Sequence, residues 1–218
     1  PCPFILPAAF LLDILAGGPP NRIHPVSLIG RCARRLETLA RQRWGGTFHA
    51  GMAAALATCI AAWFGCAALF LPFSLLPFLW APWIPSVLVI YICMAPRSLA
   101  EHARKVENAL RSGNAGEARH SVSMIVGRDT ERMDVYGIAR AAIESVAENL
   151  TDGVFSTLFW ASAGCLAGGA SGAASAALAH RVFNILDAMW GKKNERYRHF
   201  GTFAARMDDA LNFIPARL

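Results

Sequence analysis

Residues 44–96 read WGGTFHAGMAAALATCIAAWFGCAALFLPFSLLPFLWAPWIPSVLVIYICMAP and contain no Asp, Glu, Lys or Arg. A helix that crosses a bilayer core needs about 20 apolar residues, so this run is long enough for two. We expect the first span at about 50–72 and the second at about 75–96. The Pro and Trp residues between them are typical of a turn at a membrane interface. The run therefore predicts a helical hairpin in a membrane.

A second uncharged run covers residues 153–180. At about 1.5 Å per residue, a straight helix of this length would be longer than the bilayer core. The run also contains Gly164, Gly168, Gly169 and Gly172. We expect either a tilted span or a broken, re-entrant pair of helices whose small residues allow close packing.

Charge is sparse along the chain. Only 17% of the residues are charged and 55% are hydrophobic, whereas a soluble domain usually has about 25% charged residues. The net charge is +6, but the basic residues are not clustered with stacking aromatic residues, so we do not predict nucleic-acid binding. Arg-rich regions beside membrane spans normally lie in the cytoplasm.

We therefore predict an all-α fold, a polytopic integral membrane helical bundle with cytoplasmic amphipathic helices. Residues 1–218 would form a single membrane-embedded domain. Its apolar spans would lie at about 50–72, 75–96 and 153–180, and its polar cytoplasmic regions at 17–49, 97–152 and 181–218.

The polar regions contain helical patterns of their own. Leu99, Ala103, Val106 and Leu110 recur at helical spacing. We expect a partial helix at 4–16, a short surface helix at 36–43, and further helices at 98–111, 115–126 and from about 130 or 134 to 150. The six cysteines include no CxxC pair, so we expect neither a disulfide framework nor a zinc site.

Glu144, Glu148 and Asp152 follow one another at a spacing of four residues and would lie on one face of a helix. Like charges at this spacing repel one another, so the arrangement is favourable if a cation lies between them. Mg²⁺ takes oxygen ligands, often one or two carboxylates together with substrate phosphates. The alternative is an ordinary solvated acidic face, or one that Arg128 and Arg140 neutralise.

A second polar group follows the other apolar run. Asp208, Asp209 and Asn212 lie within one helical turn and again suggest Mg²⁺. Arginines suited to phosphate or carboxylate binding lie in the same region, at Arg196, Arg206 and Arg217. A structural network of ion pairs is the alternative. His24 is a third and weaker candidate, because a single histidine in an interfacial turn is a common surface feature.

Four groups of segments resemble the adenosylcobinamide-phosphate synthases of cobalamin biosynthesis. They are NRIHPVSLIGR at 21–31, VGRDT at 126–130 with AAIESVAENLTDG at 141–153, FNILDAMWG at 183–191, and NERYRHFGTFAARMDDALNFIPARL at 194–218. They occur in the order of the family and cover nearly the whole chain. Members usually carry Gly-Asp-Pro where this chain has Gly17-Gly18-Pro19, and they continue past the IPARL segment, so we expect a C-terminal truncation relative to them.

The resemblance implies ATP-dependent amide formation between adenosylcobyric acid and (R)-1-amino-2-propanol O-2-phosphate or ethanolamine phosphate. A carboxylate must be activated before an amine attacks it, and phosphoryl transfer requires Mg²⁺ and cationic side chains around the phosphate. The sequence contains no P-loop, so ATP would bind in another way. The implied partners are the corrin, the amino-alcohol phosphate and membrane lipid, with a homo-oligomer or other cobalamin-pathway enzymes possible. The implied location is the cell membrane, multi-pass, with the motif loops in the cytoplasm.

On this resemblance the candidate residues fall into three overlapping classes. The catalytic candidates are His24, Glu144, Glu148, Asp187, Asp208 and Asp209. The substrate-binding candidates are Arg31, Arg128, Asn149, Asn184, Arg196, Tyr197, Arg206, Asn212 and Arg217. The metal-binding candidates are Glu144, Glu148, Asp152, Asp208 and Asp209. We expect all of them to meet in one pocket on the cytoplasmic face.

Two other functions remain open at this point. One is a non-catalytic membrane scaffold or an inactive relative in corrin assembly, which the missing Asp near Gly18 favours. The other is an intramembrane prenyltransferase, which would have two Asp-rich motifs, whereas only Asp208-Asp209 with Asn212 fits that pattern. A transporter would hold its polar groups at the bilayer midplane, and here they border the apolar runs.

Overall fold

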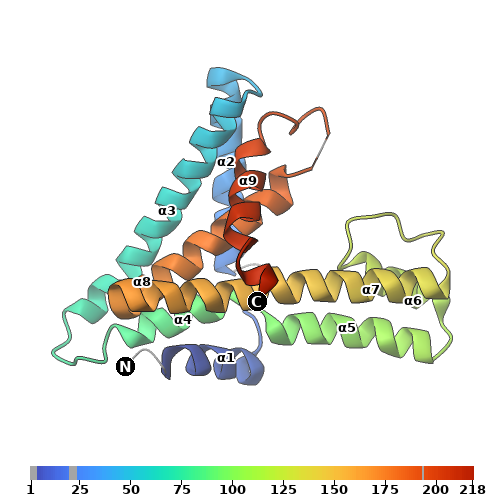
Figure 1. Ribbon diagram of the computed structural model, residues 1–218, viewed down its shortest axis with the longest axis horizontal. Coiled ribbons are helices and arrows are strands. Elements are labelled where there is room, and N and C mark those ends of the chain that lie inside the picture. Colours follow the sequence, from blue (N-terminus) through green and yellow to red (C-terminus); the bar gives the residue numbers. More distant parts are fainter. Residues whose placement is uncertain (1–3, 20–23, 193) are drawn as a thin grey trace.

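The computed structural model describes residues 4–19, 24–192 and 194–218. Every regular element in these ranges is a helix (Figure 1). Three helical segments are long and apolar enough to cross a membrane, namely Phe48–Ser74, Trp83–Arg111 and Val135–Trp190. The predicted all-α membrane bundle is therefore confirmed.

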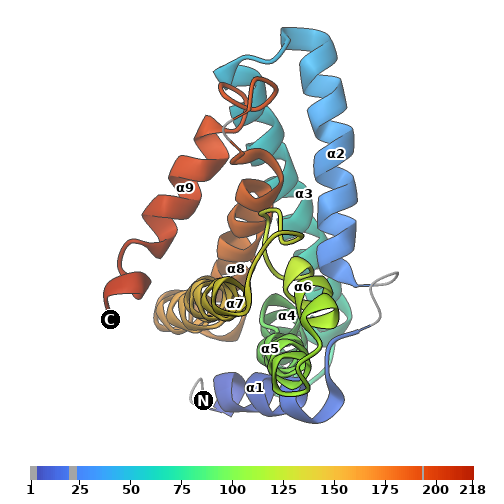
Figure 2. The same ribbon diagram turned by 90° about the vertical axis from the view of Figure 1, so that its right-hand side faces the viewer.

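The helices form two arms that meet at an angle (Figure 1). The horizontal arm contains α1 (Ile5–Ala16), α4 (Trp83–Cys93), α5 (Pro96–Arg111), α6 (Ala115–Ser123), α7 (Val135–Asn149), the π-helix η2 (Leu150–Phe155) and the first half of α8 (Ser156–Trp190). The upright arm contains α2 (Pro25–Trp44), α3 (Phe48–Ser74), the second half of α8 and α9 (Thr202–Asn212), which leads to the short 3₁₀ helix η3 (Pro215–Arg217). Figure 2 looks along the horizontal arm, and α2 and α9 rise on its two sides.

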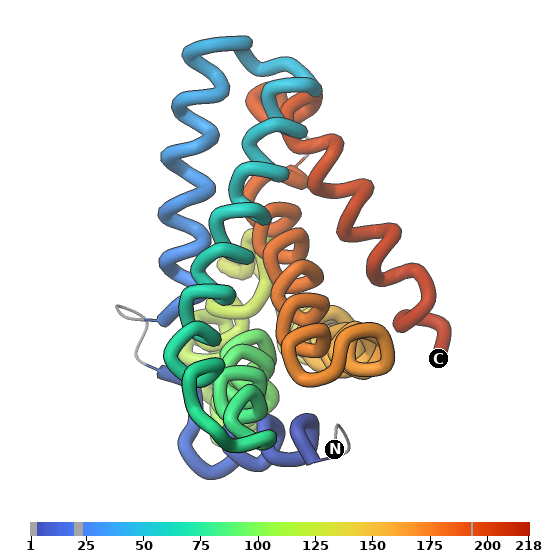
Figure 3. The backbone as a smooth tube through the Cα atoms, turned by 90° about the vertical axis from the view of Figure 1, so that its left-hand side faces the viewer, coloured from blue at the N-terminus to red at the C-terminus, as the bar shows by residue number. Residues whose placement is uncertain are grey.

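The second apolar run is broken inside α8, as one of the two alternatives predicted. Gly168 and Gly169 leave helical geometry, and Gly169 has a φ of +61°, which glycine adopts without strain. The chain then changes direction (Figure 3), and the two halves of α8 approach most closely at Gly164 and Gly172. A Cβ at Gly164 would lie 2.3 Å from the Gly172 carbonyl oxygen, and one at Gly172 would lie 2.2 Å from the Gly164 carbonyl oxygen.

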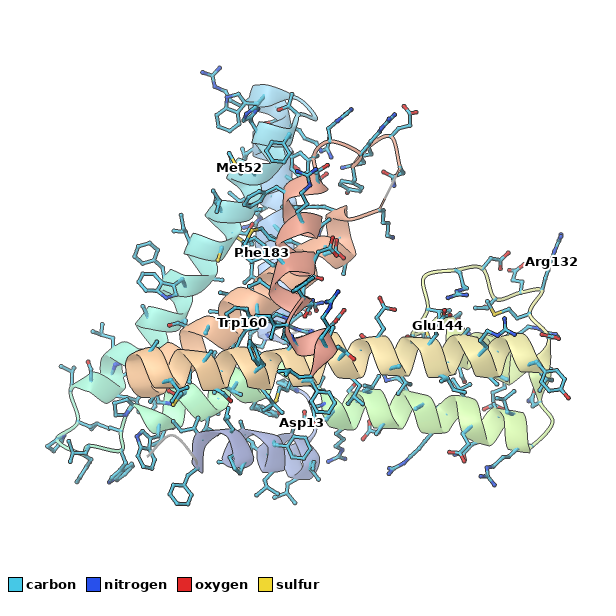
Figure 4. All side chains as sticks on the ribbon, in the orientation of Figure 1. Asp13, Met52, Arg132, Glu144, Trp160 and Phe183 are labelled. Carbon is cyan, nitrogen blue, oxygen red and sulfur yellow. The ribbon has the colours of Figure 1, made fainter. Side chains whose placement is uncertain are left out.

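Aromatic packing holds the upright arm together. Trp190 and Phe200 are fully buried, and their rings meet edge to face with centroids 5.1 Å apart. Small residues bring the neighbouring backbones close. A Cβ at Gly51 of α3 would lie 1.8 Å from the Phe200 carbonyl oxygen, and one at Gly201 would lie 1.8 Å from that of Trp190. Phe183, which Figure 4 labels between α3 and α9, belongs to the same core.

The horizontal arm contains two separate apolar cores, one at each end. In one half, Ile5 and Ala9 of α1 pack against Ile90 of α4 and Ala161 of α8. In the other, α5, α6 and α7 bury Val106, Val122, Ile138 and their neighbours. Asp13 ties the halves together, because its Oδ2 accepts a hydrogen bond of 2.8 Å from the backbone N–H of Arg97 (Figure 4).

The basic region 17–49 differs from its prediction. Instead of a short surface helix at 36–43, α2 is a 20-residue helix. Its buried residues are Gly30, Ala33, Glu37 and Ala40, which recur at helical spacing and pack against the upright arm. The arginines of this region conceal that stripe in the sequence: Arg31, Arg34, Arg35 and Arg43 are exposed, whereas Arg41 pairs with the buried Glu37.

Two predicted boundaries also differ. The second span does not begin near residue 75, since α4 starts at Trp83 and turns occupy the residues before it. The boundary predicted at residue 153 falls inside a continuous helix, because α7 passes through η2 directly into α8. The expectation about cysteines fails at Cys165, which is disulfide-bonded.

Most of the surface of α3 is apolar and faces outward. Only 22% of the residues in its apolar stretch are buried within the protein. Leu56, Ile60, Trp63 and Phe64 are each exposed on this helix. A helix of this composition is stable in that position when hydrocarbon replaces water around it.

The crossing of the two halves of α8 gives a testable prediction. Gly172→Ala places a methyl group against backbone that cannot move aside, so we expect a loss of stability of about 1–3 kcal/mol, measured by thermal unfolding in detergent. The matched control is Gly65→Ala in α3, where a Cβ meets nothing within 4 Å. That variant should be unchanged or slightly stabilised, since alanine is the better helix former. Equal stability of the two variants would contradict the close crossing.

Candidate active site

A polar cavity of about 300 Å³ lies where the two arms meet. Residues 125–128 form one part of its wall. The other parts come from the helix formed by α7 and η2, from the second half of α8 and from α9. Figure 4 shows Glu144 on the upper side of α7, on the side of the loop that precedes this helix. We call this cavity the acidic pocket, because its lining includes Glu144, Glu148, Asp152, Asp187 and Asp208.

The two predicted acidic segments meet in this pocket. Glu144, Glu148 and Asp152 line it from α7 and η2, where their spacing puts them on one face as predicted. The negative charges of Glu148, Asp187 and Asp209 lie close enough to Asp152 to repel its carboxylate. Asp209 itself is exposed and lies beside the pocket rather than in its wall.

Asp208 is the most enclosed of these carboxyl groups. Its Oδ2 accepts a hydrogen bond of 3.1 Å from Asn212 Nδ2, whereas its Oδ1 is buried without a partner. Burial, followed by the charges of Asp187 and Asp152, raises the pKa of Asp208 to about 7. A carboxyl group held at one oxygen and unpartnered at the other is oriented for a ligand at the free oxygen.

Neighbouring side chains fix the position of Asp208. Asn212 Oδ1 accepts a hydrogen bond from His180 Nε2 at 3.0 Å, so Asp208, Asn212 and His180 form one chain of contacts. The indole Nε1 of Trp160 donates to the carbonyl oxygen of Leu211 at 2.9 Å, which ties the end of α9 to the horizontal arm (Figure 4). The helix α9 is thereby held against both halves of α8.

Arg128 is the cation in the wall of the acidic pocket. Its guanidinium forms an ion pair of 2.5 Å with Glu144, and the two side chains are 57% and 58% exposed. Ion pairs with this much solvent contribute little to stability. Breaking this ion pair therefore costs the protein little stability.

The oxygen-rich lining fits Mg²⁺ as a partial set of ligands. In the described ranges, no three His, Cys, Asp or Glu side chains converge closely enough to hold a metal ion by themselves. Mg²⁺ is commonly bound by one or two carboxylates, with waters and substrate phosphates as its other ligands. Asp208, with its unpartnered Oδ1, suits that arrangement. Magnesium binding at the five predicted residues stays a prediction.

The sequence profile of the CobD/Cbib protein family matches residues 6–218. The chain belongs to this family. Among its relatives, proteins named "Cobalamin biosynthesis protein CobD" from Chromobacterium violaceum and Stutzerimonas stutzeri are 46% and 43% identical over 98% and 96% of the chain. One from Pelobacter propionicus is 40% identical over 100% of the chain. In each case the chain spans 65% of the relative's length. No solved structure matches it.

In this CobD/CbiB family member, Arg196 and Tyr197 contact a different carboxylate from those of the acidic pocket. Glu37 of α2 is buried and accepts hydrogen bonds from Arg41 Nε at 2.9 Å and Arg196 Nη2 at 3.1 Å. Trp190 Nε1 donates to it at 3.1 Å, and the Tyr197 hydroxyl lies 3.4 Å away. The structure therefore does not bring these two substrate-binding candidates into the pocket, and Arg196 fits the ion-pair alternative.

Four other candidates also lie outside the wall of the acidic pocket. His24 caps α2, since its Nδ1 accepts a hydrogen bond of 3.2 Å from the backbone N–H of Val26. Burial, and then the charge of Arg181, lowers the pKa of His24, which favours the neutral ring that this cap requires. The three arginines are exposed: Arg31 on α2, Arg206 on α9, and Arg217, whose guanidinium stacks 3.8 Å above the Phe213 ring.

The three asparagine candidates lie at or next to the pocket. Asn149 and Asn184 line it, and Asn212 holds Asp208. The Nδ2 of Asn149 donates to the Ser145 carbonyl oxygen at 2.8 Å. These neutral side chains give the carboxylates fixed neighbours without neutralising them.

Sequence reasoning missed Arg181. Its Nη1 donates a hydrogen bond of 2.9 Å to Oδ1 of Asn184. Asn184 lines the acidic pocket together with Asp208, so Arg181 is linked to that pocket through Asn184. The signal was available, because Arg181 is the first charged residue after the uncharged run 153–180. A charge at the end of such a run is costly unless it is paired or used for binding.

The buried Glu37 gives a second prediction. Burial by itself raises the pKa of Glu37, but hydrogen bonds and charges from Arg41 and Arg196 outweigh it and hold the pKa below its ordinary value of 4.5. Glu37→Gln should therefore lose about 1–3 kcal/mol of stability at neutral pH, measured by thermal unfolding in detergent.

The pH dependence follows from the lowered pKa. The ionised Glu37 carboxylate stabilises the folded protein fully above pH 4.5, and this stabilisation is lost as the pH falls through the pKa of Glu37 in the folded state. The difference between wild type and Glu37→Gln should therefore shrink in acid. Glu107→Gln is the control, because this carboxylate is 54% exposed and pairs with Arg111 on the surface. If both variants behave alike, Glu37 has no special role in the fold.

Proposed function

We propose that this chain takes part in cobalamin biosynthesis and joins adenosylcobyric acid to an amino-alcohol phosphate at the acidic pocket, at the expense of ATP. Family membership supports the pathway, since the relatives are named as cobalamin biosynthesis proteins. The observation that carries the proposal is the acidic pocket itself. It gathers five carboxylates from separate segments of the chain, and the basic residue in its described lining is Arg128, which pairs with Glu144.

The reaction divides into two steps with balanced bonds. In the first, a corrin carboxylate oxygen attacks the γ-phosphorus of ATP, which gives an acyl phosphate and releases ADP. In the second, the amine nitrogen attacks the acyl carbon, the bond from that carbon to the phosphate oxygen breaks, and inorganic phosphate leaves. The nitrogen loses protons during this step, and a neighbouring carboxylate is the natural acceptor.

Individual side chains have distinct roles in this proposal. Asp208 presents an unpartnered Oδ1 and would bind the metal or the amine from the floor of the pocket. Bound Mg²⁺ would neutralise charge on the phosphoryl group during its transfer. Arg128, which is held only by an exposed ion pair, would move from Glu144 to a phosphate or carboxylate of the substrate. Glu148, Asp152 and Asp187 would supply the negative field that attracts the cationic groups.

The proposal predicts that Asp208→Asn lowers product formation at least about 100-fold and leaves membrane insertion intact. The purified chain in detergent would receive adenosylcobyric acid, ATP, Mg²⁺ and aminopropanol phosphate, and the corrin product would be identified by mass. The substitution keeps the size of the side chain and its contact with Asn212, so a folding defect is not expected.

Glu107→Gln serves as the control for this experiment, because it removes an exposed carboxylate that does not line the pocket. Normal turnover by Asp208→Asn would refute the assignment of the site. Absence of any product from the wild-type chain, in a preparation that still binds the corrin, would favour the non-catalytic scaffold.

A further inference from the structure

Arg181 is a partly buried cation whose Nε is enclosed by the protein. Its Nε has neither solvent contact nor a hydrogen-bond partner, and its Nη1 donates to the neutral amide oxygen of Asn184. In the ranges that the structure describes, no Asp or Glu lies within the 4.0 Å of an ion pair with it. A guanidinium carries five N–H donors and remains charged. Enclosing part of such a group without an ion pair is unfavourable, so its environment suits an anion that is not part of the protein.

The guanidinium borders a second cavity of about 270 Å³, on the side of α7 and η2 that faces α5. The polar residues in the wall of this cavity are Ser98, His102, Asn149 and Arg181, and the wall contains no Asp or Glu. We call it the basic pocket. A Cβ at Gly153 would lie 3.8 Å from Arg181 Nη1, so the glycine leaves the guanidinium uncovered on this side.

The basic and acidic pockets adjoin each other. Ile125 and Asn149 belong to the walls of both. One wall therefore separates a cavity with five carboxylates from a cavity whose only charged lining group is a guanidinium. A molecule with a cationic group and an anionic group a few bonds apart could therefore place the cation in the acidic pocket and the anion in the basic pocket.

We propose that the basic pocket binds the phosphate of a phosphate monoester and that Arg181 is its principal binding residue. The guanidinium offers a planar pair of donors to two phosphate oxygens. The Ser98 hydroxyl supplies a neutral donor for a remaining oxygen. The identity of the ligand rests on the proposed function, since an amino-alcohol phosphate carries an ammonium group that would extend into the acidic pocket. The anion site itself does not depend on that function.

An anionic lipid is the alternative source of the same phosphate chemistry. Arg181 also borders a third cavity of about 390 Å³ among α2, α3, α4 and α8, which is almost entirely apolar. An acyl chain in that cavity would bring a lipid headgroup to the same guanidinium. The polar lining of the basic pocket favours the soluble phosphate ester, and the experiment includes a separate arm for lipid.

Binding of ethanolamine phosphate and of inorganic phosphate to the purified chain tests the proposal. Both would be titrated by calorimetry in a phosphate-free, uncharged detergent, without ATP or corrin. Arg181→Gln should weaken the binding of ethanolamine phosphate at least tenfold, and Arg181→Lys should retain part of it. Arg111→Gln is the matched control, because this arginine of α5 is 78% exposed and pairs with Glu107.

Thermal unfolding separates loss of binding from loss of the fold. Removal of a partly enclosed charge that has no ion pair should leave the melting temperature of the ligand-free protein unchanged or higher. Ethanolamine phosphate should raise the melting temperature of wild type and of Arg111→Gln, and this rise should disappear in Arg181→Gln. Unchanged affinity in Arg181→Gln, or an equal loss in Arg111→Gln, would overturn the proposal.

Nanodiscs with phosphatidylglycerol, compared with phosphatidylcholine alone, distinguish the two sources of phosphate. We expect ethanolamine phosphate to bind equally in both. If phosphatidylglycerol displaces it through Arg181, or if phosphate binds only when an acyl chain is attached, the site belongs to lipid and the proposal is wrong.

A turnover assay separates this site from the proposed function. If ethanolamine phosphate binds through Arg181 and no corrin product forms, the function fails and the anion site stands. If product forms with an unchanged KM for the amino-alcohol phosphate in Arg181→Gln, the anion site fails and the function stands.

Discussion

The turn of α8 at Gly168 and Gly169 is the constraint on which the site depends. The first half of α8 continues the direction of α7, and the second half must return to the same region for Asp187 to face Glu148. A straight helix would carry Asp187 away from α7 by about 1.5 Å for each residue. The close crossing at Gly164 and Gly172 makes the return possible, since no side chain separates the two backbones there.

The protein treats its buried charges in two opposite ways. Glu37 is surrounded by donors from Arg41, Arg196 and Trp190, so its charge is compensated and it stabilises the upright arm. Asp208 and Arg181 are left with unpartnered polar atoms, although only the short side chain of Asn184 separates them. An uncompensated polar group in a protein interior is expensive. Asp13 also has a buried, unpartnered Oδ1, but it lines neither pocket, whereas Asp208 and Arg181 each border one of the two adjoining cavities.

Local patterns in the sequence predicted a good part of this arrangement. The spacing of Glu144, Glu148 and Asp152 placed them on one helical face, and the uncharged runs located the membrane segments. The prediction failed where a residue's role depends on a distant partner. Arg196 and Tyr197 looked like substrate ligands because they follow an apolar run, yet Glu37, more than 150 positions earlier in the chain, binds them instead. The position of Arg181 at the end of the uncharged run marked it for attention, but only the fold shows which groups surround its guanidinium.

The sequence by itself determined that the chain is a helical membrane protein with an acidic helix face, because hydrophobicity and helical spacing are local properties that each segment carries alone. Only the tertiary structure decided which charged groups meet. The direction of α8 after its break and the position of α9 bring Asp187 and Asp208 to the pocket. The length of α2 places Glu37 where it binds Arg196. These choices depend on packing between segments that are far apart in the chain, and the energy of such contacts is absent from any single segment.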